Sequence, residues 1–168
     1  VDVGFGDAVT PAPEYVVLPS LLDAGAPRVR AYPRETAIAE KLQAMVQLGI
    51  ANSRMKDYYD VWYLAQTFPF DGAILARAIE RTFERRRTPV PTVLPTALTP
   101  MFAQDGAKQR QWRAFLTKGR LNAVDFVTVI DHMTSFVLPL FLAVSAGREF
   151  KSAWEPRGPW LPAKDSSG

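Results

Sequence analysis

The stretch that decides the fold is Ser-Arg-Met-Lys-Asp-Tyr-Tyr-Asp-Val-Trp, residues 53–62, in which charged residues are mixed with aromatic ones. At about 100° per residue, Asp57 points in the same direction as the apolar positions of the helix, with Arg54 and Asp60 on its flanks. Those apolar positions are Val61, Leu64 and Phe68. A carboxylate that faces a core is costly to desolvate unless a cation holds it. The stretch therefore predicts a helix that borders a polar site.

Composition limits the classes of protein that this chain can represent. Its 168 residues suit one domain or one compact part of a larger protein, and 48% of them are hydrophobic. The absence of cysteine excludes disulfides, thiolate metal sites and a cysteine nucleophile. The single histidine, His132, cannot form a histidine cluster, and we assign it no function. The net charge of +3 is too small to argue for nucleic-acid binding by itself.

No segment of the chain is expected to enter a membrane. The longest apolar run, residues 136–144, is interrupted by Pro139 and is too short to span a bilayer. No basic segment precedes an apolar one at the start of the chain. We therefore expect a cytoplasmic protein without membrane association.

The pattern along the chain predicts an α+β fold, with strands first and helices afterwards. Strands are expected within residues 1–32, at 1–5, 15–18 and 28–32, as the end of a sheet. A helical region follows over residues 33–150. Its first helix runs from Pro33 to Gly49 with one apolar face, formed by Ile38, Leu42 and Met45.

Further start and stop signals divide the helical region. Ser53 is expected to cap a second helix that ends near Thr67, and Asp71 a third helix. The four prolines of residues 88–100 predict an extended linker. Two more helices are expected at 108–118 and 123–146, the latter kinked at Pro139. Residues 151–168 read as a loose tail in which two tryptophans can dock, Trp154 and Trp160.

Lys41 lies on the shoulder of the apolar face of the first helix. An isolated lysine there is typically one whose stem covers the core while its ammonium reaches water. The turn to the next helix is short, however, so the two helices are expected to be antiparallel neighbours. Lys41 can then face the charged edge that carries Asp57 and Asp60.

Two interpretations of this charged edge stay open from the residues alone. It can be a structural lattice of ion pairs that fastens two helices, which is the commoner arrangement. It can also be a ligand site, in which carboxylates hold a divalent cation while lysine and arginine bind phosphate.

Three segments together carry a resemblance to a known family. They are Asp-Val-Gly-Phe-Gly-Asp at 2–7, Tyr-Pro-Arg-Glu-Thr-Ala-Ile-Ala-Glu-Lys-Leu-Gln-Ala-Met at 32–45, and Asn-Ser-Arg-Met-Lys-Asp-Tyr-Tyr-Asp at 52–60. In this combination the chain resembles the AbiEii/AbiGii toxins, nucleotidyltransferase-fold proteins of abortive-infection (phage-defence) and toxin-antitoxin systems. The likeness covers most of the chain and implies the C-terminal part of a nucleotidyltransferase-like fold.

The resemblance also implies roles for individual residues. Lys41, in a glutamate-lysine helix motif, is expected to contact nucleotide phosphate, and Asp57 to be needed for catalysis. Asp60 matches the same motif as Asp57 and is a further catalytic candidate. Arg54 and Lys56 match it as well, as nucleotide-binding candidates. On the preceding strand, Asp2 is a candidate magnesium ligand.

One part of the family pattern has no counterpart in these residues. The family's first motif, a Gly-Ser followed by two alternating aspartates that hold magnesium, is absent. We expect it upstream of Val1, so that the chain is an N-terminally truncated fragment and is inactive alone.

The intact protein is expected to be a magnesium-dependent enzyme that transfers a nucleotide from an NTP to RNA, such as tRNA, or to protein. A cognate antitoxin is its expected partner. The alternative is a non-catalytic helical module that binds an antitoxin or RNA.

A basic stripe is predicted on the third helix, opposite its apolar face. Arg77, Arg81 and Arg85 recur at every fourth position, and Arg86 and Arg87 extend them. The stripe is either a solvated helix face, with Glu80 and Glu84 for pairing, or a track for the phosphates of an RNA substrate.

Overall fold

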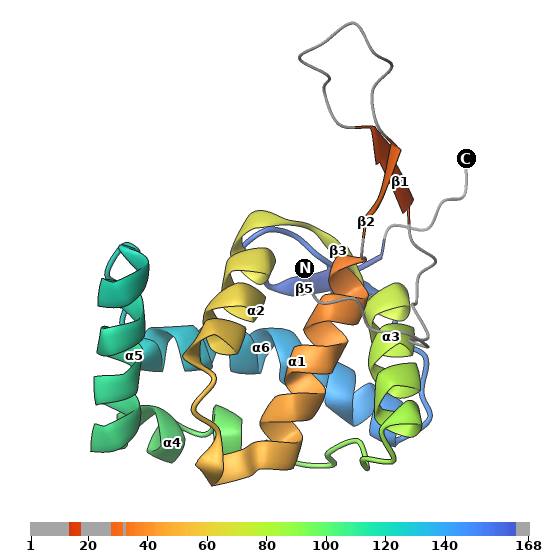
Figure 1. Ribbon diagram of the computed structural model, residues 1–168. Helices are drawn as coiled ribbons and strands as arrows, with labels where there is room; N and C mark the ends of the chain where they lie inside the picture. Colours follow the sequence, from red (N-terminus) through yellow and green to blue (C-terminus); the bar gives the residue numbers. More distant parts are fainter. Residues whose placement is uncertain (1–13, 18–27, 32, 164–168) are drawn as a thin grey trace, which may run out of the picture.

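Figure 1 shows the computed structural model of the chain, which describes residues 14–17, 28–31 and 33–163. The α+β fold predicted from the sequence is confirmed, with short strands and a larger helical bundle. The elements are β1 (Glu14–Val17), β2 (Arg28–Ala31), α1 (Arg34–Leu48), η1 (Gly49–Ala51), α2 (Met55–Thr67), β3 (Phe70–Asp71), α3 (Gly72–Arg85), η2 (Thr96–Leu98), α4 (Pro100–Gln104), α5 (Gly106–Gly119), α6 (Phe126–Ser145), β4 (Ser152–Trp154) and β5 (Trp160–Pro162).

Two of the predicted strands are present, and they pair with each other. β1 and β2 run antiparallel, with Glu14 opposite Ala31 and Val17 opposite Arg28. The strand expected at residues 1–5 lies outside the described residues.

The core of the bundle forms around α6, which crosses behind α1 and α2 in Figure 1 and contacts α2, α3 and α4. Nine of its residues are buried, among them Phe136, Val137 and Phe141. Although we expected no apolar segment long enough to span a membrane, α6 is 20 residues long and apolar enough to do so by length and composition. Pro139 lies inside the helix without ending it. Packing in the core accounts for the apolar character of α6.

The predicted helix ends are confirmed where a single residue determines them. α1 ends at Gly49, whose φ of 50° favours glycine, and α3 begins after Asp71, whose carboxylate accepts hydrogen bonds from the amides of Ala73 and Ile74. Other boundaries differ from the prediction. α6 begins only at Phe126, and the short helix α4 was not predicted.

The expected loose tail is in part a well-packed hairpin. β4 and β5 pair with each other and extend the short strand β3. Trp154 is 1% exposed, and its indole NH donates to the carbonyl of Ala65 at 2.8 Å. The indole NH of Trp160 donates to the carbonyl of Phe136 at 2.9 Å. The docking expected of these two tryptophans is confirmed, and each indole both buries a large apolar surface and satisfies its polar atom.

His132 lies where the hairpin meets α6. Its ring packs against Trp154, and Nε2 lies 3.3 Å from the carbonyl oxygen of Arg157. Burial lowers the pKa of His132 below 6.5, although this carbonyl favours the protonated ring. The unfolded chain therefore binds a proton at a higher pH than the folded chain does.

We predict that His132 makes the protein less stable as the pH falls below about 6.5. The contribution of His132 to stability is full above that pH, where its ring is neutral in both the folded and the unfolded chain. This contribution is lost as the pH falls toward the pKa of His132 in the folded chain. Urea denaturation between pH 5 and 8 should give a steeper decline for the native chain than for His132→Gln, by at most about 1.4 kcal/mol per pH unit. Parallel curves for the two proteins would contradict the prediction.

Candidate functional site

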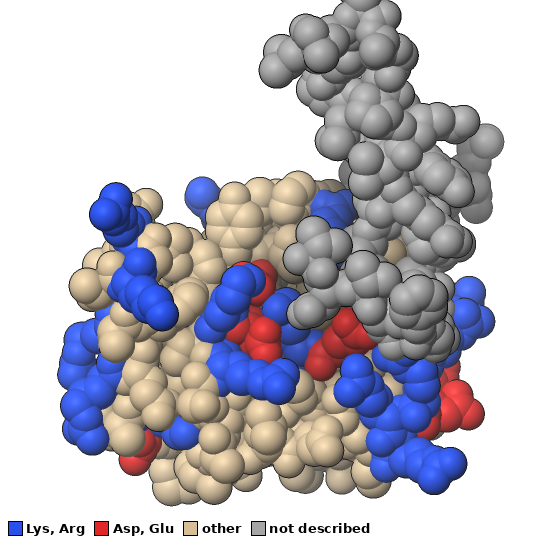
Figure 2. All heavy atoms as spheres, in the orientation of Figure 1, with Lys and Arg blue, Asp and Glu red and all other residues tan. Residues whose placement is uncertain are grey.

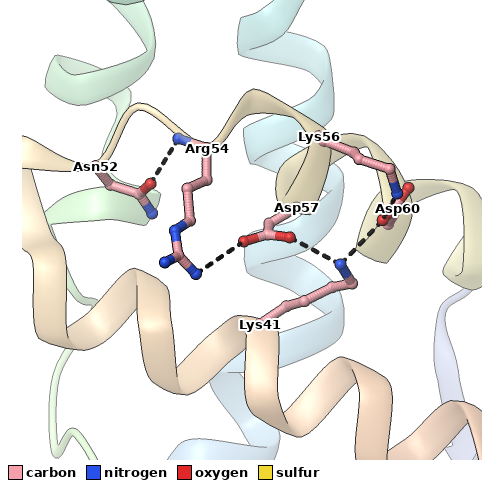
Figure 3. A network of polar contacts seen from close by, with 6 residues as sticks. All are labelled: Lys41, Asn52, Arg54, Lys56, Asp57 and Asp60. Carbon is pink, nitrogen blue, oxygen red and sulfur yellow. Dashed lines mark hydrogen bonds and ion pairs between the residues drawn. The ribbon is translucent and has the colours of Figure 1, made fainter. Parts of the chain in front are cut away.

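Helices α1 and α2 bring a lysine and two aspartates together, as the sequence predicted (Figure 3). The Nζ of Lys41 lies 2.7 Å from Oδ1 of Asp57 and 2.9 Å from Oδ2 of Asp60. The side chains are 23%, 15% and 25% exposed, so the cluster is partly buried but open to solvent. One ammonium thus holds two carboxylates that would otherwise repel each other.

The N-terminus of α2 differs from the prediction. Ser53 does not cap the helix; the N-cap residue is Arg54, which makes no side-chain capping bond. The turn is held instead by Asn52, whose side-chain oxygen accepts a hydrogen bond from the amide of Arg54 at 2.9 Å. Asn52 is fully buried, so this contact fixes where α2 begins and where Asp57 points.

Lys108 of α5 supports the same turn from behind. It is 7% exposed, and its Nζ donates to the carbonyl oxygen of Asn52 at 2.7 Å. The ammonium also lies 4.9 Å from the ring centre of Phe102, at a distance typical of a cation–π contact. The sequence carries no local signal for this role of Lys108, because its partner Asn52 is distant in sequence.

Two further cations flank the aspartates. Arg54 lies 4.0 Å from the second carboxylate oxygen of Asp57. Lys56 lies 2.6 Å from Asp60, but its side chain is 72% exposed. An exposed pair of this kind contributes at most about 1 kcal/mol to stability, so Lys41 is the central cation of the cluster.

The protonation states of Lys41 and Tyr58 favour the binding of a charged ligand over proton transfer by either residue. Burial, the largest single effect, lowers the pKa of Lys41, but hydrogen bonds and attraction from Asp57 and Asp60 together raise it above 10.5. Burial, reinforced by the charge of Asp57, also raises the pKa of Tyr58. At neutral pH Lys41 is a cation and Tyr58 is a neutral phenol, so neither is a base.

A cavity of about 460 Å³ opens beside this cluster, between α1, α2 and the end of α3. Its walls include Lys41, Arg54, Asp57 and Arg86. Figure 2 shows the carboxylates at the centre of this face with cationic side chains around them. Sequence reasoning placed Arg86 only at the end of the basic stripe, because the packing of α3 against α1 that brings it to Lys41 has no local signal.

Because α3 packs against α1, the arginines of the predicted basic stripe do not form one continuous surface. Arg85 turns to α1 and forms an ion pair with Glu40 at 3.1 Å. Arg77 is exposed near Glu80, Arg148 and Glu149, with which it lines a smaller cavity on α3 and the end of α6. Arg81 is exposed as well.

The described carboxylates do not by themselves form a magnesium site. Within residues 33–163 no group of three metal-ligating side chains comes together, and Lys41 holds both Asp57 and Asp60. Asp2, the predicted third carboxylate, lies outside the described residues.

Comparison with known families gives one match. Residues 1–133 match the family model described as "Nucleotidyl transferase AbiEii toxin, Type IV TA system". The chain belongs to this family. No curated protein and no solved structure matches it.

The match to the AbiEii family covers the whole Lys41 cluster. The matched residues include all of α1, α2 and α3, and hence every residue of the Lys41 cluster. AbiEii proteins are nucleotidyltransferase toxins of type IV toxin-antitoxin systems, which implies a cognate antitoxin as partner.

Proposed function

We propose that this AbiEii protein binds an NTP at Lys41 and transfers its nucleotide to an RNA or protein acceptor. The observation that supports the proposal is the bonding of Lys41 to both Asp57 and Asp60 at the wall of an open cavity. Arg54 and Arg86 add two cations to the same cavity. Such a set matches the negative charge of a triphosphate.

In this mechanism the triphosphate replaces the aspartates as the partner of Lys41. Asp57, released from the ammonium, is then available to accept the proton of the acceptor hydroxyl. The acceptor oxygen bonds to the α-phosphorus, the bond between that phosphorus and the bridging oxygen breaks, and pyrophosphate leaves. Arg54 and Arg86 hold the phosphates, while Asp60 and Lys56 keep the start of α2 in place.

Magnesium has no step in this mechanism. The resemblance implied a magnesium ion, but the described carboxylates do not fit one. The residues of the chain also contain no alternating aspartate pair. We therefore expect residues 1–168 to bind NTPs, and the proposed transfer to need a protein that carries such a pair as well.

The alternative is a non-catalytic module in which the same ion pairs only fasten α1 to α2. The short Lys41 contacts are compatible with it, because buried ion pairs often serve structure alone. The two functions make opposite predictions for Asp57.

Replacing Asp57 with asparagine distinguishes the nucleotidyltransferase from the non-catalytic module. We expect the variant to keep its melting temperature within a few degrees, to bind NTPs at least as tightly as the native chain, and to lose transfer. Binding is measured by calorimetry with each of the four NTPs, and transfer with α-labelled NTPs and a form of the protein that also carries an alternating aspartate pair. Lys151→Ala, which removes an exposed lysine paired with Glu149, is the control. A lower melting temperature with unchanged transfer would support the scaffold instead.

A further inference from the structure

We infer that one end of the helical bundle, which carries no charged side chain, is a surface on which two copies of this chain associate. This uncharged end consists of residues 42–53, from α1 to the turn before α2, and residues 88–104, from the linker to the end of α4. The inference is independent of the proposed function, because it concerns apolar side chains that do not line the Lys41 cavity.

The lack of charge is a property of both segments. In the whole chain 22% of the residues are charged, yet residues 42–53 and 88–104 contain no aspartate, glutamate, lysine or arginine. The fold joins the two segments, because η2 of the second contacts α1 and η1 of the first. Figure 2 shows largely uncharged atoms along the lower edge of the molecule, where Figure 1 places α4, the end of α1 and the linker after α3. Two stretches that are separate in sequence thus form one uncharged surface.

This surface exposes large apolar side chains. Eight such side chains are exposed in the described part of the chain, and four of them lie here: Leu48 (39% exposed), Ile50 (59%), Val93 (71%) and Met101 (74%). The other four are distributed over α2, α3, α6 and β5. Apolar side chains scattered singly over a surface are ordinary, whereas a group of them marks an interaction surface.

The uncharged end is held in place before any partner binds. Gln43 of α1 donates to the hydroxyl of Thr88 at 2.8 Å, and Thr134 of α6 donates to the carbonyl of Leu98 at 3.1 Å. Three prolines restrict the chain between these two contacts: Pro89, Pro91 and Pro95. A surface that is already ordered loses little conformational entropy on binding, so a modest apolar area can support association.

The charge distribution favours a second copy as the partner. In a twofold-symmetric dimer the same surface of both copies meets, so a charge on that surface comes close to like charges. The uncharged end has no charge that could repel its own copy. By contrast, α5 exposes Arg110, Arg113 and Lys118 and carries no carboxylate, so two copies would repel each other there. A nucleic acid would find no cation for its phosphates at the uncharged end.

Sedimentation velocity of residues 1–168 between about 1 and 200 μM tests the inference. The mass of the native chain is expected to rise with concentration from that of one chain to that of two. Two triple variants place like charges on the surface: Ile50, Val93 and Met101 are replaced with lysine in one variant and with glutamate in the other. Each variant alone should dimerise at least about tenfold more weakly, because like charges meet. An equimolar mixture should dimerise again, because opposite charges then meet.

A matched control carries the same change of charge elsewhere. It combines Ile74→Lys, Leu142→Lys and Leu161→Lys, at exposed apolar side chains of α3, α6 and β5. This control should dimerise like the native chain. Melting temperatures show that each variant is folded, and Met101→Lys and Met101→Glu give the same comparison at a single position if a triple variant is not folded.

Several outcomes would overturn the inference. They are a native chain that stays monomeric, a dimer that persists in both charged variants, a mixture that does not dimerise, and an equal loss in the control. Binding of the cognate antitoxin to a monomeric chain, lost in the lysine variant, would assign the surface to the antitoxin instead. A monomeric native chain that binds NTPs would refute only this inference, and a dimer that binds no NTP would refute only the proposed function.

Discussion

Replacing Lys41 with methionine is expected to weaken NTP binding by about 10- to 150-fold. A hydrogen bond between a charged donor and a charged acceptor contributes about 1.5–3 kcal/mol, and each 1.4 kcal/mol changes affinity tenfold. Methionine keeps most of the length and apolar surface of the lysine stem, so the variant loses mainly the positive charge. Calorimetric titration of each NTP into the native chain and the variant measures the effect.

The controls for this prediction separate binding from folding. Lys56→Met removes the other lysine that contacts Asp60, but its side chain is mostly exposed, so we expect less than a fivefold change. Lys41→Met also leaves two aspartates close together without their cation, which should lower the melting temperature. Adding Asp57→Asn removes one of the two charges and should restore stability without restoring NTP binding. Native-like NTP affinity in Lys41→Met would refute the nucleotide site and favour the structural lattice.

Replacing Trp154 with alanine is expected to destabilise the protein by about 3–5 kcal/mol. The indole is buried against Phe136 and Trp160, with ring centres 4.8 Å and 5.3 Å away, and its NH binds the carbonyl of Ala65. Alanine would leave a large cavity, while the carbonyl of Ala65 would keep only its second hydrogen bond, from the amide of Arg157. The free energy of unfolding, measured by urea denaturation, is the direct test.

Leu161 provides the matched control for the hairpin. It belongs to β5 and is 47% exposed, so Leu161→Ala should change the free energy of unfolding by no more than about 0.5 kcal/mol. If Trp154→Ala lowers the free energy of unfolding by less than about 1 kcal/mol, the hairpin is a loose tail. The site would then depend only on the helices that precede it.

The helices of this protein could be predicted because their signals are local. The apolar positions of α1 recur at the helical period, Gly49 supplies the positive φ that ends it, and Asp71 caps α3 with its own side chain. The cluster of Lys41 with Asp57 and Asp60 could be predicted for the same reason. Two adjacent helices joined by a short turn must lie side by side, so residues on their facing edges meet.

Other features could not be predicted, since their partners are far apart in sequence. Lys108 meets the carbonyl of Asn52 across 56 residues, and Trp154 meets that of Ala65 across 89. Neither residue type nor spacing reveals such a contact. A lysine in an otherwise basic segment reads as exposed, and a tryptophan in a tail can be expected to dock without its partner being known.

By itself the sequence determined the longer helices, the charged edge of α2 and the pairing of Lys41 with two aspartates. The family resemblance in the same residues added the nucleotidyltransferase class. Only the tertiary structure decided which cations share a cavity with Lys41. Periodicity fixes the direction in which a side chain leaves its own helix. The packing of α3 against α1 depends on the whole core, and this packing brought Arg86 to the site.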